Sequence, residues 1–312
     1  MSRSLLGLID QASGEMGLAQ PASVIGIAIN QTMQLLALTQ RLGLDLVREF
    51  QWNQLVKAYI FQTTAAQTKL AAVTAAGTTT MTVQQGSAVP VAGMVLSGTG
   101  IAPYTELVSF TSSGPNYILT LSMPTTAAIA GNAVITFAYQ DYAMPSDYDR
   151  MIADSSWDRT NHWRNLGTKS SQEWQTLQGG LISVGPRERF RVYANKLRIF
   201  PALTSVSNMA FEYVSNYWVL ASGDSAATKS SFTIDTDTAI FPDDLMLAGI
   251  KYYFLRAKKL DFGIELAEFN NILDVRKSQD VPIPAQSLAP IRVPELVGPW
   301  SIADGNWPTS SI

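Results

Sequence analysis

The fold is decided by the stretch from Tyr142 to Arg191, which reads YAMPSDYDRMIADSSWDRTNHWRNLGTKSSQEWQTLQGGLISVGPRERFR. It holds three of the seven tryptophans, the only histidine and most of the alternating charge in the middle of the chain. It contains no enzyme motif. The chemistry of these residues alone therefore predicts a soluble protein of mixed α and β structure with a structural role.

The stretch combines turn, strand and helix signals. Pro145-Ser146-Asp147 is typical of a turn, and a strand is expected at Arg150–Ala153. Residues Ser170 to Gln178 predict a short helix, because Ser170 or Ser171 can cap it. Gly179-Gly180 is expected to end that helix.

Strands are expected after this stretch, because polar and apolar residues alternate there. The expected hairpin turn is Asn195-Lys196. The three strands are Phe190–Tyr193, Lys196–Phe200 and Met209–Ser215.

The clearest helix of the chain is predicted at Phe241–Lys277. Pro242 suits the first helical position, and Asp243 and Asp244 complement the N-terminal dipole. Apolar residues at helical spacing form one face, and the face is expected to continue beyond Gly263. Its members are Leu247, Ile250, Phe254, Ala257, Leu260, Leu266, Phe269, Ile272 and Leu273.

The N-terminal part is predicted to be helical before its first strand. A short amphipathic helix is expected at Ser4–Met16 and a longer one within Asn30–Phe50, with Asn30 as N-cap. Gly43 lies inside the second helix at a cost of about 1 kcal/mol relative to alanine. A strand is expected at Gln54–Thr63, where Val56, Ala58, Ile60 and Gln62 recur with period two.

Composition changes sharply between Thr63 and Ala138. Lys69 and Glu106 are the only charged residues there, and Thr, Ser, Gly and Val dominate. Short strands between turn residues predict a small sandwich or barrel. We name residues 63–138 the β insert. The expected strands are Thr79–Val83, Gly93–Leu96, Leu107–Thr111, Tyr117–Leu121 and Ala133–Phe137.

The β insert also contains a weak internal repeat. Met81-Thr82-Val83 matches Leu119-Thr120-Leu121, and Val91-Ala92-Gly93 matches Ile129-Ala130-Gly131. Two Thr- and Val-rich hairpins also look alike without any repeat, so both interpretations stay open.

From Asp280 the helical pattern gives way to proline. Six prolines lie in residues 280–312, which predicts an extended segment with polyproline character. Its apolar residues are too many for a solvated linker, so we expect this tail to bind another subunit. They are Ile283, Leu288, Ile291, Val293, Leu296, Val297 and Trp300.

These elements predict an α+β architecture. The N-terminal helices and the long C-terminal helix are expected to form a helical bundle against a β core, with a sandwich-like all-β insert and an extended tail. The expected boundaries are 1–62 for the N-terminal helices and first strand, 63–138 for the β insert, 139–240 for the β core, 241–279 for the C-terminal helix and 280–312 for the tail.

Composition excludes several kinds of site. The chain has no cysteine and one histidine, which excludes disulfides, thiolate chemistry and multi-histidine metal sites within one chain. The net charge of −3 gives no global basic field for nucleic acid. No run approaches the roughly 18–20 apolar residues of a membrane span. The N-terminus does not resemble a signal peptide, so synthesis in the cytosol is expected, and no cofactor or metal is expected.

Three sequence motifs that could support catalysis or ligand binding are incomplete. His162 could act as a base near Asp154 and Asp158, but it lacks a partnered nucleophile. Gly98-Thr99-Gly100 begins like a dinucleotide fingerprint, but Pro103 occupies the third glycine position. Asp235-Thr236-Asp237 begins like a calcium loop without the later ligands, so turn and N-cap roles are expected there.

Acidic residues of the central stretch could form a pair for glycoside cleavage. The alternative is a surface on which they pair with Arg150 and Arg159, and this is the favoured interpretation. The four candidates are Asp147, Asp149, Asp154 and Asp158.

One basic cluster and three tryptophans are candidates for intermolecular contacts. The basic cluster could touch phosphates or form salt bridges between subunits. The tryptophans could stack on sugars, but anchoring a core or an interface is their more frequent use. The basic cluster is Arg187, Arg189, Arg191, Lys196 and Arg198, and the candidate interface residues are Trp157, Arg159, Trp163, Trp174, Arg187, Arg189 and Arg191.

The order of several short motifs resembles one family, the bacteriophage head-to-tail adaptors, also called tail tubular protein A or head-completion connectors. The resemblance covers residues 30–62 and 140–275; the β insert and the tail depart from the simplest members. The motifs are Gln34-Leu35-Leu36, Glu49-Phe50-Gln51-Trp52, Met144-Pro145-Ser146-Asp147-Tyr148-Asp149-Arg150, Trp157-Asp158-Arg159, Gln172-Glu173-Trp174, Gly185-Pro186-Arg187, Phe211-Glu212-Tyr213-Val214-Ser215-Asn216, Asp235-Thr236-Asp237-Thr238 and the helix from Leu245 to Phe269.

The resemblance implies a non-enzymatic ring, usually a dodecamer, in the neck of the virion. One side would bind the portal, the other would receive the tail tube or nozzle protein, and DNA would pass through with transient non-specific contact. The C-terminal segment commonly reaches the portal in this family. Assembly would take place in the host cytoplasm.

Two other classes of function stay open. The Thr-rich insert and the tryptophans could belong to a carbohydrate-binding or tail-fibre module. A tail-associated glycosidase would use one of the four acidic candidates named above.

Overall fold

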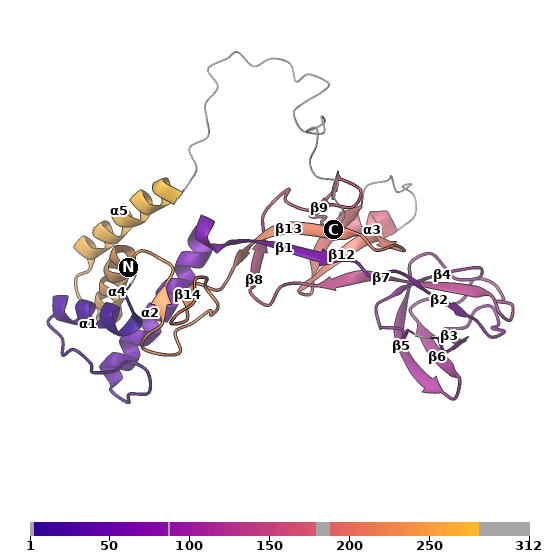
Figure 1. The fold of residues 1–312 in the computed structure, drawn as a ribbon, viewed down its shortest axis with the longest axis horizontal. Coiled ribbons are helices and arrows are strands. Elements are labelled where there is room, and N and C mark those ends of the chain that lie inside the picture. Colours follow the sequence, from indigo (N-terminus) through magenta and orange to yellow (C-terminus); the bar gives the residue numbers. More distant parts are fainter. Residues whose placement is uncertain (1–2, 87, 179–187, 281–312) are drawn as a thin grey trace, which may run out of the picture.

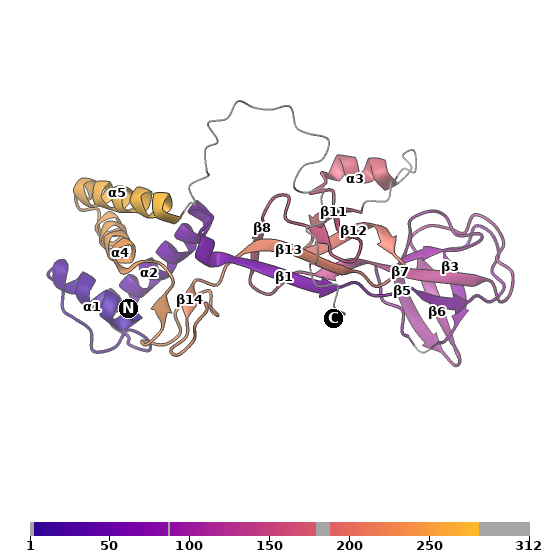
Figure 2. The same cartoon turned by 45° about the horizontal axis from the view of Figure 1, so that its top comes forward.

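The computed structural model describes residues 3–86, 88–178 and 188–280. The chain is a mixed α+β protein with five α-helices and several antiparallel sheets in the described part. The helices other than α3 gather at one end of an elongated molecule, two facing sheets form the middle, and the β insert forms the other end (Figures 1 and 2). No helix in these described ranges is long and apolar enough to cross a membrane.

Four helices share one hydrophobic core at the first end of the molecule. In this core α4 contacts α1, α2 and α5. Ser4 caps α1, since its Oγ accepts a hydrogen bond from the Gly7 amide at 3.3 Å. Asn30 is the first residue of α2 and not its N-cap; Ile29 takes the cap position without a side-chain bond. The helices are α1 (Leu5–Glu15), α2 (Asn30–Glu49), α4 (Asp243–Lys258) and α5 (Gly263–Asp280).

The single helix predicted at Phe241–Lys277 is wrong: the segment forms α4 and α5. Lys259 adopts the left-handed conformation with φ of 58°, and this ends α4. The amides of Lys259 and Leu260 donate to carbonyls of the last turn of α4, as in common C-terminal caps. Asp261 then accepts a hydrogen bond from the amide of Gly263, where α5 begins. Pro242 precedes α4 as its N-cap residue.

Residues after β13 belong to the helical core, which corrects the expected boundary of the β core at residue 240. Trp218 and Phe232 are buried there beside the helices. The Trp218 ring lies against Gly43 of α2, where an added Cβ would be 2.2 Å from Cζ2. Two short strands that the sequence did not predict hold this segment: β14 (Val219–Leu220) and β15 (Thr238–Ala239).

Two antiparallel sheets face each other across an aromatic core in the middle of the molecule. Phe211 and Tyr213 enter this core from one sheet, and Leu197 and Ile199 from the other. The first sheet contains β1 (Val56–Gln62), β8 (Tyr148–Met151), β9 (Trp157–Asp158), β10 (Trp163–Arg164) and β13 (Asn208–Ser215); the second uses β11 (Arg189–Tyr193), β12 (Lys196–Leu203) and part of β7 (Val134–Ala143).

The β insert has its own hydrophobic core. A bridge between Ala71 and Val83 brings β2 beside β3, so the strand order closes on itself around that core. The first pair of matching triplets of the expected repeat lies on the paired strands β3 and β6, where Met81 is opposite Leu119 but Thr82 is opposite Ile118. The strands besides β7 are β2 (Gln67–Leu70), β3 (Thr80–Gln84), β4 (Val95–Ser97), β5 (Thr105–Ser113) and β6 (Asn116–Leu121).

The β insert is not an independent module, because β7 is shared. Its first half pairs with β2 and β4, and its second half pairs with β12 of the central sheets. One continuous strand therefore crosses the boundary expected at residue 138.

The other predicted elements are confirmed within a few residues. The short helix is α3 (Ser171–Gln178), and a 3₁₀ turn at Asn53–Leu55 precedes β1. The hairpin between β11 and β12 turns at Ala194 and Asn195, because Tyr193 already pairs with Lys196. Gly179-Gly180 and the tail after Asp280 lie outside the described residues.

Candidate assembly surfaces

The outer face of the first central sheet carries large apolar side chains in solvent. Alternate residues of β1 point to opposite sides, so Tyr59 and Phe61 enter the core while Ile60 points outward. Ile60 is 56% exposed and Trp157 is 44% exposed. We name this region the outer sheet face: Ala58, Ile60, Gln62, Trp157, Arg159, Asn208, Ala210 and Glu212.

The register of the strands gathers these residues. Ile60 and Trp157 both lie opposite Ala210 of β13, on either side of it, and Ala58 lies opposite Glu212. A hollow beside them is lined by Ala58, Ser155, Trp157, Arg159, Ala210, Phe211 and Glu212. An apolar centre with an arginine and a glutamate at its rim is typical of a protein–protein contact.

The three tryptophans of the central stretch do not form one platform. Trp157 pairs with Arg164 and Trp163 pairs with Asp158, so the two indoles project from opposite faces of the β9–β10 ribbon. Trp163 is 39% exposed. Trp174 is fully buried beside Phe200. The expectation that Trp174 contacts another subunit is therefore wrong, because it packs inside its own chain.

Helix α3 lies beside β11, and its Trp174 contacts one residue of the basic cluster, Arg191. Ser170 and Glu173 form a reciprocal cap at the start of α3, at 3.2 and 2.9 Å. The guanidinium of Arg191 lies 4.7 Å from the Trp174 ring centre and 4.6 Å from that of Tyr193. Burial lowers the pKa of Arg191, with Arg198 nearby as a second cause.

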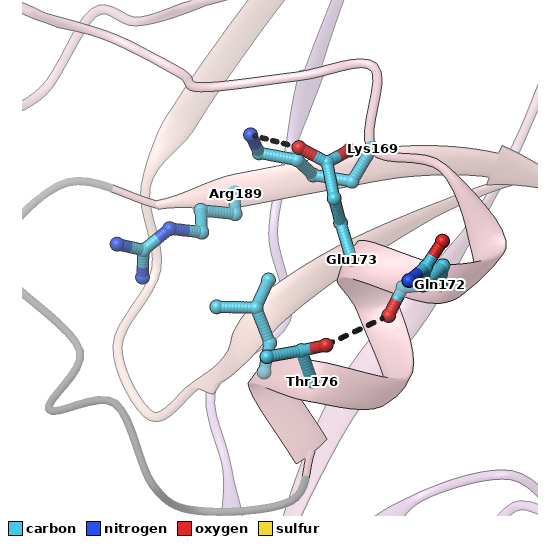
Figure 3. Close-up of a pocket in the computed structure, with 6 residues that line it drawn as sticks. Lys169, Gln172, Glu173, Thr176 and Arg189 are labelled. Atoms are coloured by element: carbon cyan, nitrogen blue, oxygen red, sulfur yellow. Dashed lines mark hydrogen bonds and ion pairs between the residues drawn. The ribbon is translucent and has the colours of Figure 1, made fainter.

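Arg189 lies at a pocket beside α3 (Figure 3). Its guanidinium projects away from the ion pair between Lys169 and Glu173, whose atoms are 3.3 Å apart. The lining residues are Lys169, Gln172, Glu173, Thr176, Leu177 and Arg189. Arg187 lies outside the described residues.

Arg198 is committed to an internal ion-pair cluster. It donates two hydrogen bonds to Asp141 of β7, at 2.6 and 2.8 Å, and a third to Glu106 of β5 at 3.2 Å. Gln140 donates to the same Glu106 oxygen at 2.7 Å. The pKa of Arg198 is raised, chiefly by its hydrogen bond to Asp141. This cluster ties the β insert to the central sheets and leaves Arg198 little capacity for phosphate.

The four acidic candidates for catalysis are each held by local partners. Asp147 accepts hydrogen bonds from Lys57, Tyr213 and Ser215, each at 2.7 Å. Burial opposes ionisation of Asp147, but these three hydrogen bonds hold its pKa below the usual value. The other three are engaged too: Asp149 with Arg150, Asp154 with Arg164, and Asp158 with the amides of Thr160 and Asn161.

His162 and Glu188 are the remaining titratable groups near the β9–β10 ribbon. His162 is an exposed turn residue with φ of 57°. Glu188 is buried, and burial raises its pKa to about 7, with the charge of Asp158 as a smaller cause. Its oxygen Oε2 has no hydrogen-bond partner in the described part of the chain.

The aspartates of the motif that begins like a calcium loop accept hydrogen bonds in turns. Asp235 accepts from the amides of Val24 and Ile25, and Asp237 pairs with Lys229 at 2.8 Å. They do not cap the following helix, which corrects the N-cap expectation. Within residues 3–86, 88–178 and 188–280, no group of three or more acidic or histidine side chains could hold a metal ion.

Comparison with known proteins gives no family for this chain: no family model matches it, and a search of curated proteins finds no match.

Sequence reasoning missed the exposed Ile60 and the buried cluster around Arg198. The period-two alternation of residues predicted the strand β1, but it did not predict which face of β1 packs in the core. The cluster joins residues more than ninety positions apart, from Glu106 to Arg198, so no local pattern could reveal it. The arginines at alternate positions of β11 were the sequence feature that came nearest to indicating this cluster.

Proposed function

We propose that this protein is a non-enzymatic structural component of a phage virion: a dodecameric ring adaptor that joins the portal to the tail and lines the DNA channel. The observation that carries the proposal is the outer sheet face, where Ile60 is 56% and Trp157 is 44% exposed. Large apolar side chains grouped on a surface are typical of a site covered by a partner. The order of the short motifs, which resembles that of head-to-tail adaptors, is the reason for proposing this particular assembly.

In this proposal the helices at one end act as the bundle of the adaptor. Helices α1, α2, α4 and α5 share a core, which supports that role. The tail from residue 281 is proposed to bind the portal protein through its apolar residues, because extended segments bind well in grooves and at sheet edges of partners. The other end of the ring would meet the tail tube or nozzle protein.

The proposed channel contact with DNA is transient. Arg191 and Arg198 are engaged inside the chain, and the net charge is −3. Two arginines of the basic cluster are therefore not free for strong phosphate contacts, which suits passage of DNA.

The first test is the mass of the full-length protein, alone and after mixing with purified portal rings. We expect a ring, or binding to the portal ring, to be visible by mass photometry and electron microscopy. Ile60→Asp and Trp157→Ala should each reduce this assembly without loss of folding. The matched control is Val73→Asp in the β insert, where Val73 is 82% exposed. A chain that stays monomeric with portal present would refute the adaptor.

The second test removes the tail alone. The cut should follow Asp280, because that residue accepts a hydrogen bond from the Asn53 amide at 2.7 Å and belongs to the folded part. The shortened protein should keep its melting temperature and lose affinity for the portal. Unchanged affinity would show that the tail has another role.

A further inference from the structure

Helix α2 presents a mixed apolar and basic stripe to solvent. Met33 is 45% exposed and Leu44 is 36% exposed, although the opposite side of the helix lies in the core. The guanidinium of Arg41 is 3.6 Å from Asp45, but its side chain stays 64% exposed. We name these residues the α2 stripe: Met33, Ala37, Arg41, Leu44 and Arg48.

Helix α5 presents a mixed apolar and acidic stripe. Ile264 is 80% exposed and Val275 is 53% exposed. The Glu268 side chain is 50% exposed, and its only ion-pair distance in the described residues is 3.7 Å, to Lys251. We name these residues the α5 stripe: Ile264, Ala267, Glu268, Asn271, Asp274 and Val275.

The two stripes belong to two helices that both pack against α4, which lies between them (Figure 2). No ion pair of the described residues joins one stripe to the other within the chain. Two different surfaces that fit each other form a head-to-tail contact between copies, and such contacts give a ring when the rotation from copy to copy closes.

The charges match when the helices run in the same direction. Arg41 beside Glu268 brings Arg48 beside Val275 and one position from Asp274, since the arginines are seven positions apart and the acids six. The same alignment places Ala37 beside Ile264. Opposite charges at the rim of an apolar seam favour this register over others.

The course of the chain also favours the parallel direction. The C-terminal ends of α2 and α5 meet, because Lys277 pairs with Glu49 at 2.9 Å. Asp244 at the start of α4 pairs with Arg276 near the end of α5 at 2.6 Å, so α4 runs opposite to α5. Both α2 and α5 run toward this shared end, at an angle to each other (Figures 1 and 2). Neighbours in a large ring differ by a small rotation, so α2 of one copy and α5 of the next keep this common sense of direction.

We propose that the α2 stripe of one copy packs in parallel against the α5 stripe of a second copy. This inference rests on the proposed ring and names the helical contact that holds it. Arg41 faces Glu268 and Arg48 lies next to Asp274 of the second copy, with Leu44, Ile264 and Val275 as apolar contacts.

Disulfide cross-linking tests the contact directly, because the chain has no cysteine of its own. Arg48→Cys and Asp274→Cys are made as separate full-length proteins, mixed, assembled and oxidised. A disulfide requires Cα atoms within about 7 Å, so a covalent dimer with one copy of each variant should form. Neither variant alone should give a dimer. The matched control mixes Arg48→Cys with Val73→Cys, which lies in the β insert, and should give none.

The outcomes separate this contact from the ring itself. Oligomers that form without the mixed cross-link overturn the α2–α5 contact and leave the ring standing. A cross-linked dimer of Arg48→Cys alone overturns the head-to-tail arrangement in favour of a symmetric one. Monomers under all conditions, with portal present, overturn both proposals.

Charge exchange gives an independent readout. Arg41→Glu with Arg48→Glu should abolish oligomers, and so should Glu268→Arg with Asp274→Arg. A mixture of these two double variants should form rings with alternating copies, because the acidic α2 stripe of one variant faces the basic α5 stripe of the other, and the two unchanged stripes face each other at the next contact. The quadruple variant should restore the ring. Rings formed by either double variant alone would contradict the proposal.

Discussion

Gly43 shows how one residue joins two distant segments of the chain. The Trp218 ring fills the space beside it, and an added Cβ would lie 2.2 Å from Cζ2. Gly7 in α1 is different, because its nearest neighbour, Ser4 Oγ, would be 3.5 Å from such a Cβ. Gly43 therefore permits a close contact with Trp218, whereas Gly7 permits no such contact and only lowers the helix propensity of α1.

Gly43→Ala should lower the free energy of unfolding by about 1–3 kcal/mol, because overpacking outweighs the gain in helix propensity. Gly7→Ala should raise it by up to about 1 kcal/mol. Urea unfolding of both variants measures this difference. A stabilised Gly43→Ala protein would show that Trp218 does not occupy this space.

Glu188 should make stability depend on pH. Its folded pKa of about 7 lies above the ordinary 4.5, so between these values the folded chain keeps a proton that the unfolded chain releases. Its contribution is therefore fully present below pH 4.5 and is lost as pH rises through about 7. Glu188→Gln does not titrate, so its stability relative to the natural chain should increase over this range.

Urea midpoints from pH 4.5 to pH 8 measure the effect of Glu188. Glu212→Gln is the control, because Glu212 is exposed on the outer sheet face. A constant difference between Glu188→Gln and the natural chain at all pH values would contradict the raised pKa.

At the scale of elements, the break between α4 and α5 depends on one residue. Lys259 has φ of 58°, a conformation that costs a residue with a Cβ about 1 kcal/mol or more. There is no glycine at this position, so helical periodicity alone extended the predicted helix through it. The capping hydrogen bonds of Lys259 and Leu260 compensate for the strain.

Lys259→Gly should raise the free energy of unfolding by about 0.5–1 kcal/mol, since glycine adopts this conformation without a steric cost. Lys258→Gly, one residue earlier and still helical, should lower it by about 0.5–1 kcal/mol. Thermal unfolding followed by circular dichroism compares the pair. Equal effects of the two substitutions would argue that α4 continues through Lys259.

At the scale of the whole molecule, the three larger hydrophobic cores of the described residues are joined by few elements. The helical core, the central core and the core of the β insert are distinct clusters. Strand β7 and the cluster around Arg198 connect the last two. Such an arrangement allows one part to open while the others stay folded.

Leu119→Ala tests this separation, because Leu119 is fully buried in the β insert. The substitution should cost about 2–5 kcal/mol locally, so the amides of β3 and β6 should exchange faster while those of α2 and α4 keep their protection. Ile250→Ala in α4 should have the reverse effect. Hydrogen exchange with mass spectrometry measures both, and a loss of protection spread evenly over the chain would contradict separate cores.

The sequence by itself determined most of the local structure. Helical spacing placed α1 and α2, alternation placed β1 and β11 to β13, and Ser170 with Glu173 placed α3. It also marked the β insert, because charge is nearly absent there. These features are local: each depends on residues within one or two turns or strands.

Only the tertiary structure decided how the faces are used. Both faces of β1 carry apolar residues, and the second sheet covers Tyr59 and Phe61 while Ile60 stays outside. Trp174 and Trp157 are the same residue type, yet α3 buries one and the β9–β10 ribbon exposes the other. Burial depends on partners distant in sequence, and alternation or helical spacing in one segment carries no information about them.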